Sequence, residues 1–339
     1  MKKQAIIPLF ITHMGCPHAC VFCNQNAITA SDTQMDSLQV REMMESKLSN
    51  LEPLGLDTLE AAFYGGSFTG LSFALQRELL GVVLPYKLSG RIQKIRLSTR
   101  PDYISTEVLD LLRSYQVDII ELGVQSFDDL VLSLSNRGHT AEQTINACRL
   151  VKEYGFSLGI QLMIGLPGDS EEAAQKSALK AVEMRPDFVR IYPTVVLKDS
   201  QLADMFYHGR YIPLTTKEAV DVAKEMVRIF DQANIPIIRL GLKSTDNICT
   251  DSDLAGAYHP AFRQLVEGEL AFDDLVAQLR AINLREGLVQ FSAHPKSFSN
   301  LVGQKGINKR RFVELYPKIR FVYKSDCTLP ERKYFLTLL

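Results

Sequence analysis

Short apolar runs alternate with amphipathic helical segments through most of the chain, and this alternation constrains the fold more than any other feature. Each run ends in glycine or in polar residues, as buried parallel strands do. The runs occupy residues 5–13, 60–66, 94–99, 117–126, 157–168 and 187–196. Strands and helices in alternation predict one parallel sheet with right-handed crossovers.

The first run contains a proline, which constrains the shape of the sheet. Pro8 cannot donate a backbone hydrogen bond, so we expect this strand at an edge of the sheet. A sheet that keeps a free edge is not a closed barrel. The sequence therefore predicts an α/β fold, a partial (β/α)6 TIM-type barrel. A seventh run at 235–242 would extend the sheet.

The alternating pattern weakens after about residue 245. Residues 256–282 have a helical pattern, and "LVQFSAHP" and "IRFVYK" are typical of strands. We therefore predict a core at 1–245 and a small C-terminal α+β extension at 246–339.

Composition limits the kinds of partner. The formal net charge of -1 and pI of about 6.6 give no global signal for nucleic acid or an anionic membrane. No apolar stretch approaches the ~20 residues that span a bilayer. Pro8, Thr12 and His13 interrupt the apolar start of the chain, which indicates a strand and not a signal peptide. We expect a cytoplasmic, reducing location without membrane contact.

Three cysteines follow the first predicted strand directly. The stretch "MGCPHACVFC" places Cys16, Cys20 and Cys23 in a C-x3-C-x2-C spacing. Loops that follow the strands form the active face of a β/α barrel. Three thiolates with one iron position left open suit a [4Fe–4S] cluster. Structural zinc with His18 or His13 as fourth ligand is the alternative, and the spacing alone does not exclude it.

Cys148 has a different context, inside a predicted helix. The pair Thr140 and Gln143 forms a capping box, and Gly155 marks the end of the helix. Cys148 shares a face with Val151, so we predict that it is a core residue.

Glycine and polar residues mark the ends of other predicted strands. The pair Gly65–Gly66 allows a ligand to approach the backbone, although a tight turn would also use it. Arg100 needs an anionic partner, which is either a ligand or the nearby Asp102 or Glu121.

Two further residues each have two possible roles. His139 is either a substrate contact or a loop residue before the Thr140 cap. Lys198 either faces the site or is a solvated loop charge.

The cysteine spacing, the aromatic Phe22 before the last cysteine and the glycine pair in "FYGGSFTG" together resemble the radical S-adenosylmethionine (SAM) enzymes. The stretches "STRPD", "ELGVQS", "NRGHT", "MIGLPG" and "RIYPTVV" follow in order. Over about residues 5–245 the sequence is similar to the radical SAM domain of the Elongator catalytic subunit and its stand-alone bacterial relatives.

The resemblance implies two cofactors and their chemistry. SAM would chelate the open iron of a [4Fe–4S] cluster, and an electron from the reduced cluster would break the C5′–S bond. The resulting 5′-deoxyadenosyl radical would abstract hydrogen from the substrate. A low-potential donor of the ferredoxin or flavodoxin type would supply the electron.

The resemblance also assigns residues. The glycine motif would hold the SAM amino group, although many members have an acidic residue at the position of Ser67. Arg137 would neutralise the SAM carboxylate, and Met163 and Ile164 would pack on adenine. The implied cofactor-binding residues are Phe22, Gly65, Gly66, Ser67, Arg100, Gln125, Arg137, Met163, Ile164 and Tyr192.

The chain also departs from the Elongator subunit. That subunit carries a C-terminal acetyltransferase domain, for which residues 246–339 are short, and no acyl-CoA-type glycine loop is evident. We therefore expect a stand-alone radical SAM enzyme, with tRNA as a candidate substrate. One alternative is a small molecule or tetrapyrrole, because oxygen-independent coproporphyrinogen oxidase shares "GVQS-F". The other is a non-catalytic zinc-binding protein.

A basic stretch lies near the C-terminus. In "GQKGINKRRFVELYPKIRFVYK" (303–324), Lys and Arg alternate with Phe and Tyr. Such a pattern suits RNA, or a solvated face with buried aromatics, and both readings stay open. Tyr258 and His259 are further candidate substrate contacts.

Overall fold

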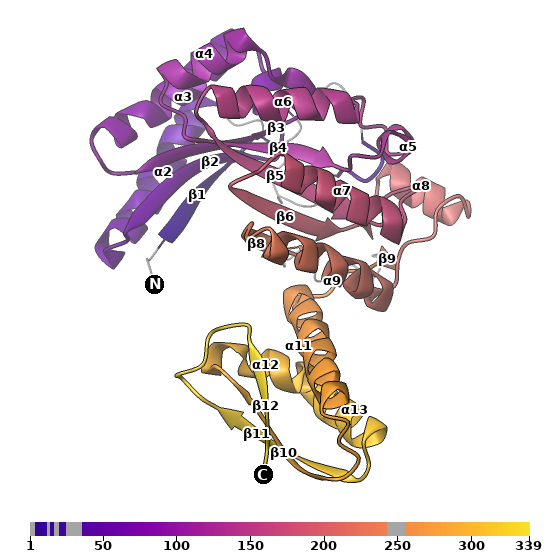
Figure 1. Cartoon of the computed structure of the whole chain (residues 1–339). Coiled ribbons are helices and arrows are strands. Elements are labelled where there is room, and N and C mark those ends of the chain that lie inside the picture. The colour runs from indigo at the N-terminus through magenta and orange to yellow at the C-terminus, as the bar shows by residue number, and fades with distance from the viewer. Residues whose placement is uncertain (1–3, 12–13, 17–19, 25–35, 243–254) are drawn as a thin grey trace.

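A computed structural model describes residues 4–11, 14–16, 20–24, 36–242 and 255–339 (Figure 1). Its largest element is a curled parallel sheet in the order β1-β2-β3-β4-β5-β6-β8. The strands are β1 (Gln4–Phe10), β2 (Thr58–Tyr64), β3 (Lys94–Thr99), β4 (Ile119–Gln125), β5 (Ser157–Ile164), β6 (Phe188–Pro193) and β8 (Ile237–Leu240). The predicted partial barrel is confirmed, with β1 at one edge and the seventh strand at the other.

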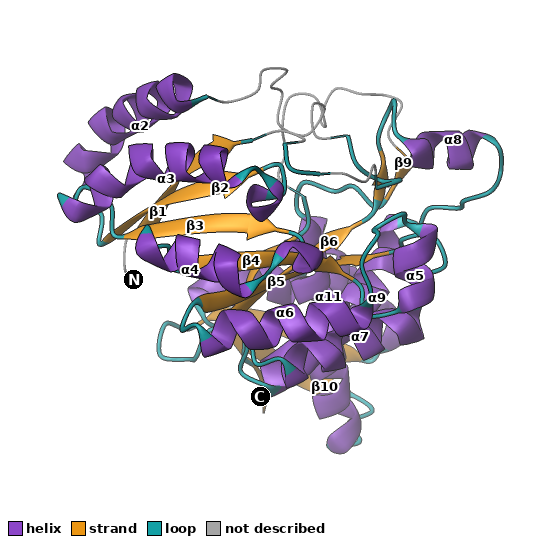
Figure 2. Cartoon of the chain, turned by 90° about the horizontal axis from the view of Figure 1, so that it is seen from above, coloured by secondary structure: helices purple, strands orange, loops and turns teal. Residues whose placement is uncertain are grey.

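Helices cover the outer face of this sheet (Figure 2). They are α2 (Ser37–Leu51), α3 (Phe73–Leu88), α4 (Thr106–Ser114), α6 (Ala141–Glu153), α7 (Glu171–Glu183) and α9 (Thr216–Gln232). The short helices α5 (Asp129–Leu134) and α8 (Gln201–Tyr207) follow β4 and β6, and the short strands β7 (Val195–Val196) and β9 (Ala255–Gly256) pair antiparallel. Single 3-10 turns span Glu52–Leu54, Phe68–Gly70, Pro101–Tyr103, Pro295–Ser297 and Gln304–Gly306.

Helix α6 begins as its sequence predicts. The Thr140 side chain accepts a hydrogen bond from the Gln143 backbone, and the Gln143 side chain accepts one from the Thr140 backbone. Cys148 lies in the core at 1% exposure, and burial raises the pKa of its thiol to about 12. Cys148 is therefore a packing residue, as predicted.

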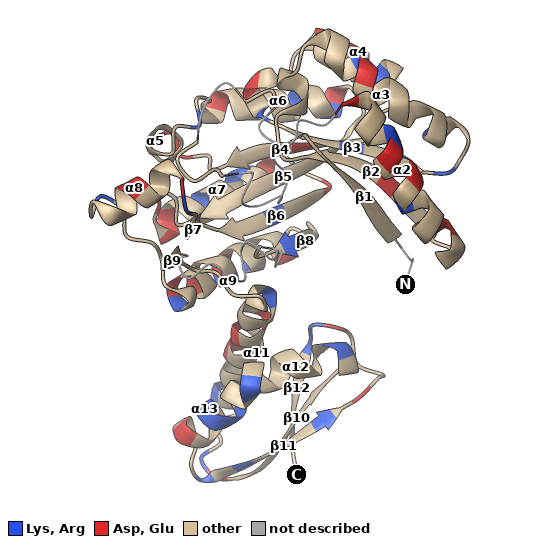
Figure 3. Cartoon of the chain, turned by 180° about the vertical axis from the view of Figure 1, so that it is seen from behind, with Lys and Arg blue, Asp and Glu red and all other residues tan. Residues whose placement is uncertain are grey.

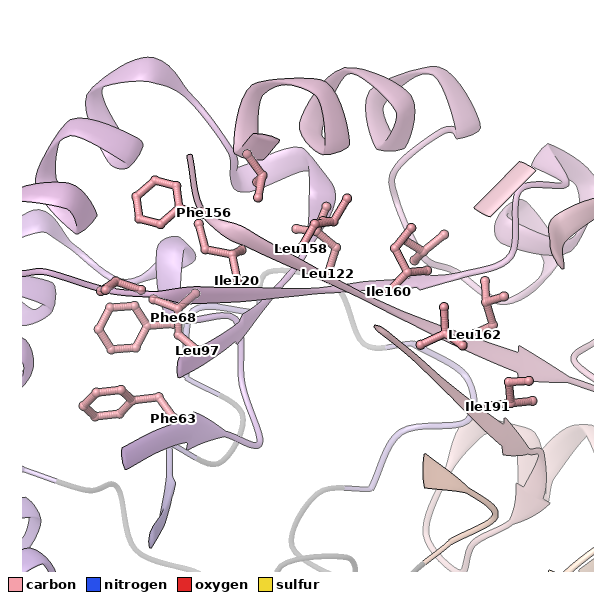
Figure 4. Packing of buried hydrophobic residues seen from close by; sticks show 14 of the residues in the cluster. Phe63, Phe68, Leu97, Ile120, Leu122, Phe156, Leu158, Ile160, Leu162 and Ile191 are labelled. Carbon is pink, nitrogen blue, oxygen red and sulfur yellow. The ribbon is translucent and has the colours of Figure 1, made fainter. Parts of the chain in front are cut away.

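The sheet separates an apolar outer layer from a polar inner face. Alternate strand residues such as Ile120, Leu158 and Ile160 pack under the helices (Figure 4). On the inner face, Gly159 leaves room for the Phe188 ring: a Cβ at Gly159 would lie 2.4 Å from Phe188 Cζ. Because successive side chains of a strand point to opposite faces, one set packs against the helices and the other set lines the inner face with polar groups.

The C-terminal part forms a second layered unit. Helix α11 (Phe262–Ala281) packs with α12 (Phe298–Val302) and α13 (Ile307–Leu315) on a sheet of order β11-β10-β12. Its strands are β10 (Gly287–Ala293), β11 (Ile319–Ser325) and β12 (Tyr334–Leu338). The α+β character of the extension is confirmed, while the predicted boundary at residue 245 lies outside the described residues.

The aromatics of the basic stretch are packing residues. Phe312 is fully buried, and Phe321 and Tyr316 pack against the same core. The Arg311 guanidinium stacks over the Phe272 ring and pairs with Glu269. These aromatics are therefore not free to stack on nucleic-acid bases, although several lysines and arginines around them remain exposed.

None of the helices in the described ranges combines the length and apolar character that a membrane crossing requires.

We expect Gly159→Ala to lower the free energy of unfolding by about 1–3 kcal/mol, because the added methyl group overlaps the buried Phe188 ring. Urea denaturation of the full chain measures this change. Gly81→Ala, at an exposed position of α3, is the control: the nearest neighbour of the added Cβ would be 4.0 Å away, and we expect no loss of stability. Equal stability of the two variants would contradict the packing assigned to Gly159.

Candidate active site

The loop that carries the cysteines interlocks with the glycine motif after β2. Ser67 donates its backbone N–H to the Met14 carbonyl at 3.0 Å. A Cβ on Gly66 would lie 2.4 Å from the Ile11 carbonyl oxygen, and a Cβ on Gly15 would lie 2.2 Å from that of Ser67. Only glycine permits these backbone approaches, so Gly15 and Gly66 together fix where the cysteine loop begins.

The second half of the cysteine loop has separate anchors. Val21 donates its N–H to the Ser135 carbonyl, and Leu202 donates to the Val21 carbonyl at 2.7 Å. Phe22 packs against the small apolar cluster around Val196. The loop is thus held from both ends by backbone contacts.

None of the three clustered cysteines forms a disulfide with another described cysteine. Cys20 is buried, while Cys16 and Cys23 are partly exposed. The Arg137 Nη1 donates to Cys20 Sγ at 3.1 Å, and its Nη2 donates to the Gly123 carbonyl. Arg137 therefore brings a buried positive charge directly to the thiol site.

Arg100 lies close to the same thiols but has a protein partner. Its guanidinium forms a two-pronged contact with Asp102, at 2.9 and 2.7 Å. Burial and the neighbouring Cys20 raise the pKa of the Cys16 thiol, while Arg100 and Arg137 act to lower it. Of the two partners left open by the sequence, Asp102 binds Arg100, whereas Glu121 pairs with Arg96 and Arg190.

A cluster of buried hydroxyls, which was not predicted from the sequence, orients the glycine motif. Thr99 Oγ1 lies 3.0 Å from Ser67 Oγ and 2.6 Å from Thr69 Oγ1. The Ser67 hydroxyl also accepts the Arg100 N–H. The sequence does contain a sign of this cluster, because the "KIRLST" run ends in Ser98 and Thr99. Hydroxyls at the end of a buried strand usually have hydrogen-bond partners.

Gln125 ends β4 in an unusual backbone conformation. Its φ is 67°, and the pairing of β4 with β5 shifts register at this point. The Gln161 side-chain amide donates to Gln125 Oε1 at 3.2 Å. A non-glycine residue held in this region costs on the order of 1–3 kcal/mol, and such strain concentrates at functional sites.

His139 is buried, which the sequence did not predict. It is 4% exposed, and burial together with Arg137 lowers the pKa of its imidazole to about 3. A neutral His139 therefore accompanies the two arginines near the thiols.

The remaining predicted residues divide between the inner face and the core. Met163 and Tyr192 are register partners and partly exposed, while Ile164 is fully buried in the outer core. Lys198 is exposed, and His259 Nδ1 accepts the Ala261 N–H in its own loop.

The donor chemistry fits an iron–sulfur cluster. Thiolates suit iron, and the two buried arginines offset the negative charge that three thiolates bring. Within the described ranges, no three His, Cys, Asp or Glu side chains surround a common metal position. His13 and His18, the candidate fourth zinc ligands, lie outside those ranges.

Two family models match the chain. The Radical SAM superfamily model covers residues 10–181, and the Radical_SAM C-terminal domain model covers residues 186–271. The chain therefore belongs to the radical SAM superfamily, a class of enzymes that use a [4Fe–4S] cluster and S-adenosylmethionine.

Named relatives agree with the Elongator-like motifs. The chain is 28% identical to the tRNA uridine(34) acetyltransferase of Methanocaldococcus infernus over 64% of this chain and 48% of that protein. For Elongator complex protein 3 of Saccharomyces cerevisiae the identity is 25%, over 66% and 48%. The chain spans about half the length of these two relatives.

Two other matches extend further along the chain. The heme chaperone HemW of Bacillus subtilis is 23% identical over 89% of this chain and 84% of its own. The solved structure of archaeal Elp3 from M. infernus, with an N-terminal deletion, superposes with a TM-score of 0.60. That match has 23% identity over 84% of this chain and 64% of the other, and it supports the fold.

We expect Gly66→Ala to displace the cysteine loop, because its methyl group would overlap the Ile11 and Met14 carbonyl oxygens. In the metal-free chain, alkylation of buried Cys20 should then accelerate by roughly threefold or more. Peptide mass spectrometry measures the rate, with Gly81→Ala as control. An unchanged Cys20 rate would contradict the interlock.

Proposed function

We propose that this chain is a radical SAM enzyme that holds a [4Fe–4S] cluster through Cys16, Cys20 and Cys23. The observation that supports this most directly is the buried Arg137 on Cys20, beside the interlocked glycine motif. When bound, the cluster and SAM supply reductive cleavage of the sulfonium and so radical chemistry on a substrate. A low-potential electron donor and a cytoplasmic location belong to this proposal.

The chain's own residues position and screen this chemistry. Arg137 and Arg100 offset negative charge around the thiols, and the neutral His139 adds no further charge. Gly66 holds the end of β2 against the Ile11 and Met14 carbonyl oxygens, and the partly exposed Gly65 beside it leaves backbone for a ligand to approach. Met163 and Tyr192, partly exposed on the inner face, offer a surface on which adenosine could lie. The polar groups are held by neighbours, so the site is preorganised.

For the substrate we propose tRNA. The relatives with tRNA-directed names support this class, as do the exposed Lys318, Arg320 and Lys324 near the C-terminal sheet (Figure 3). The alternative is a small molecule or tetrapyrrole, which the long match to a heme chaperone supports. We also propose that the unit after residue 245 recognises the substrate and that the core performs the chemistry.

Replacing any one of Cys16, Cys20 or Cys23 by Ala should abolish both cluster binding and SAM cleavage. The wild-type chain, reconstituted anaerobically, should hold about four irons and release 5′-deoxyadenosine on reduction with SAM. Iron analysis and chromatography of the nucleoside measure these outcomes.

The control for this test is Cys148→Ala, which should retain full iron because Cys148 lies in the core. A colourless wild-type chain that holds one zinc would overturn the enzyme assignment.

Binding of tRNA should be salt-dependent and should involve β11. We expect the double variant Lys318→Gln/Arg320→Gln to lower the slope of log K against log salt by up to about 1.8. Fluorescence anisotropy with labelled tRNA measures this slope, with Lys176→Gln/Lys180→Gln on α7 as control. Lack of wild-type binding at low salt would reject tRNA and leave SAM cleavage untouched.

A further inference from the structure

Arg239 on β8 is brought to the inner face of the sheet by an irregular register. Val189 pairs with Ile237, but the next residue, Arg190, pairs with Arg239. Ile238 is therefore an extra residue, and it is exposed. Register partners in a parallel sheet point to the same face, so Arg239 lies beside Arg190. A bulge at the rim of a barrel characteristically re-aims a side chain in this way.

The carboxylates of the inner face are already used by other arginines. Arg96 pairs with Glu60 at 2.7 Å, and Arg190 pairs with Glu121 at 2.9 Å. Arg239 is partly buried and forms no ion pair or side-chain hydrogen bond with the residues that the structure describes. Figure 3 places acidic and basic positions together on the strands of the large sheet. Within the described ranges, no carboxylate forms an ion pair with Arg239.

Two arginines lie near Arg239, and each has a carboxylate partner: Glu121 for Arg190 and Glu267 for Arg263. Arg190 is the neighbour of Arg239 on β6, and Arg263 on α11 donates to the Ile237 carbonyl at 2.6 Å. Burial lowers the pKa of Arg263; Glu267 opposes this shift, and repulsion from Arg332 and Arg239 adds to it. Arg239 therefore adds a partly buried charge that no described carboxylate offsets, and at low effective dielectric this favours a bound anion.

Two tyrosines supply donors on the same face. The hydroxyls of Tyr64 and Tyr192 accept hydrogen bonds from Arg190, at 3.1 and 3.4 Å. A phenol that accepts a hydrogen bond keeps its own O–H to donate. Both hydroxyls can therefore turn their hydrogens toward an anion near Arg239.

We propose that Arg239, assisted by Tyr192, binds an anionic oxygen group of the substrate, a phosphate or a carboxylate, on the inner face of the half-barrel. The planar guanidinium offers two parallel N–H donors, which match either group. This inference rests on the proposed function, because it places the substrate on the face that Met163 shares. In this arrangement the substrate lies with its anionic group toward the β6–β8 edge of the sheet.

Binding of two probes to the reconstituted full chain tests this. Uridine 5′-monophosphate carries a phosphate, and coproporphyrin III carries carboxylates. We expect Arg239→Gln to weaken the affinity for one of these probes by about tenfold or more. Arg239→Lys should restore part of that affinity. Arg280→Gln, at the exposed end of α11, is the control and should leave the affinity unchanged. Calorimetry measures the affinities, and the weakened probe identifies phosphate or carboxylate. Failure of both probes to bind, or equal affinities in Arg239→Gln and wild type, would overturn the proposal.

Thermal unfolding without probe separates binding from a structural role. Because Arg239→Gln removes repulsion from Arg190 and Arg263, we expect its Tm to equal or exceed that of the wild type. A lower Tm would indicate a structural role and overturn the proposal. Neither measurement needs SAM or a reductant, so failure here is distinct from loss of iron or of 5′-deoxyadenosine in the wild type, which would reject the proposed function.

Discussion

The backbone interlock between the cysteine loop and the end of β2 is the contact on which the site depends. Side chains cannot make it, because a Cβ on Gly15, Gly66 or Gly70 would fall within 2.5 Å of a carbonyl oxygen of the opposing segment. It holds the start of the cysteine loop beside the glycine motif, where Cys16 and Cys20 lie near Arg100 and Arg137. The arginines that reach the thiols, Arg100 and Arg137, follow β3 and β4. Shifting the loop would therefore separate the sulfur donors from their compensating charges.

The inner face of the open sheet is lined by charged residues. Closed barrels fill their interior with layers of branched apolar side chains, but here Glu60, Arg96, Glu121 and Arg190 occupy that position. Buried ion pairs give little net stability, since desolvation opposes their attraction. Their contribution is to join β2, β3, β4 and β6 while keeping the inner face polar. Stability comes instead from the outer layer, where the helices pack.

The features predicted correctly from the sequence are those that a local residue pattern determines. The strands, the edge position required by Pro8, the Thr140 cap and the burial of Cys148 all depend on residues near in sequence. The choice of Asp102 as the partner of Arg100 did not follow, because a spacing of two residues leaves side-chain direction open until the Pro101–Tyr103 turn is formed. The contact between the Thr99 and Ser67 hydroxyls could not be predicted either. It depends on β2 and β3 being neighbours in the sheet, and the sequence alone does not give the strand order.

Helix α11 links the two parts of the chain physically. Its first turns, with Phe262 and Val266, belong to the barrel core, and its later turns, from Ala271, belong to the C-terminal core. Arg263 on the same helix holds the β8 backbone. Because both cores share this helix, the C-terminal unit is packed against the sheet at the edge where the register bulge lies.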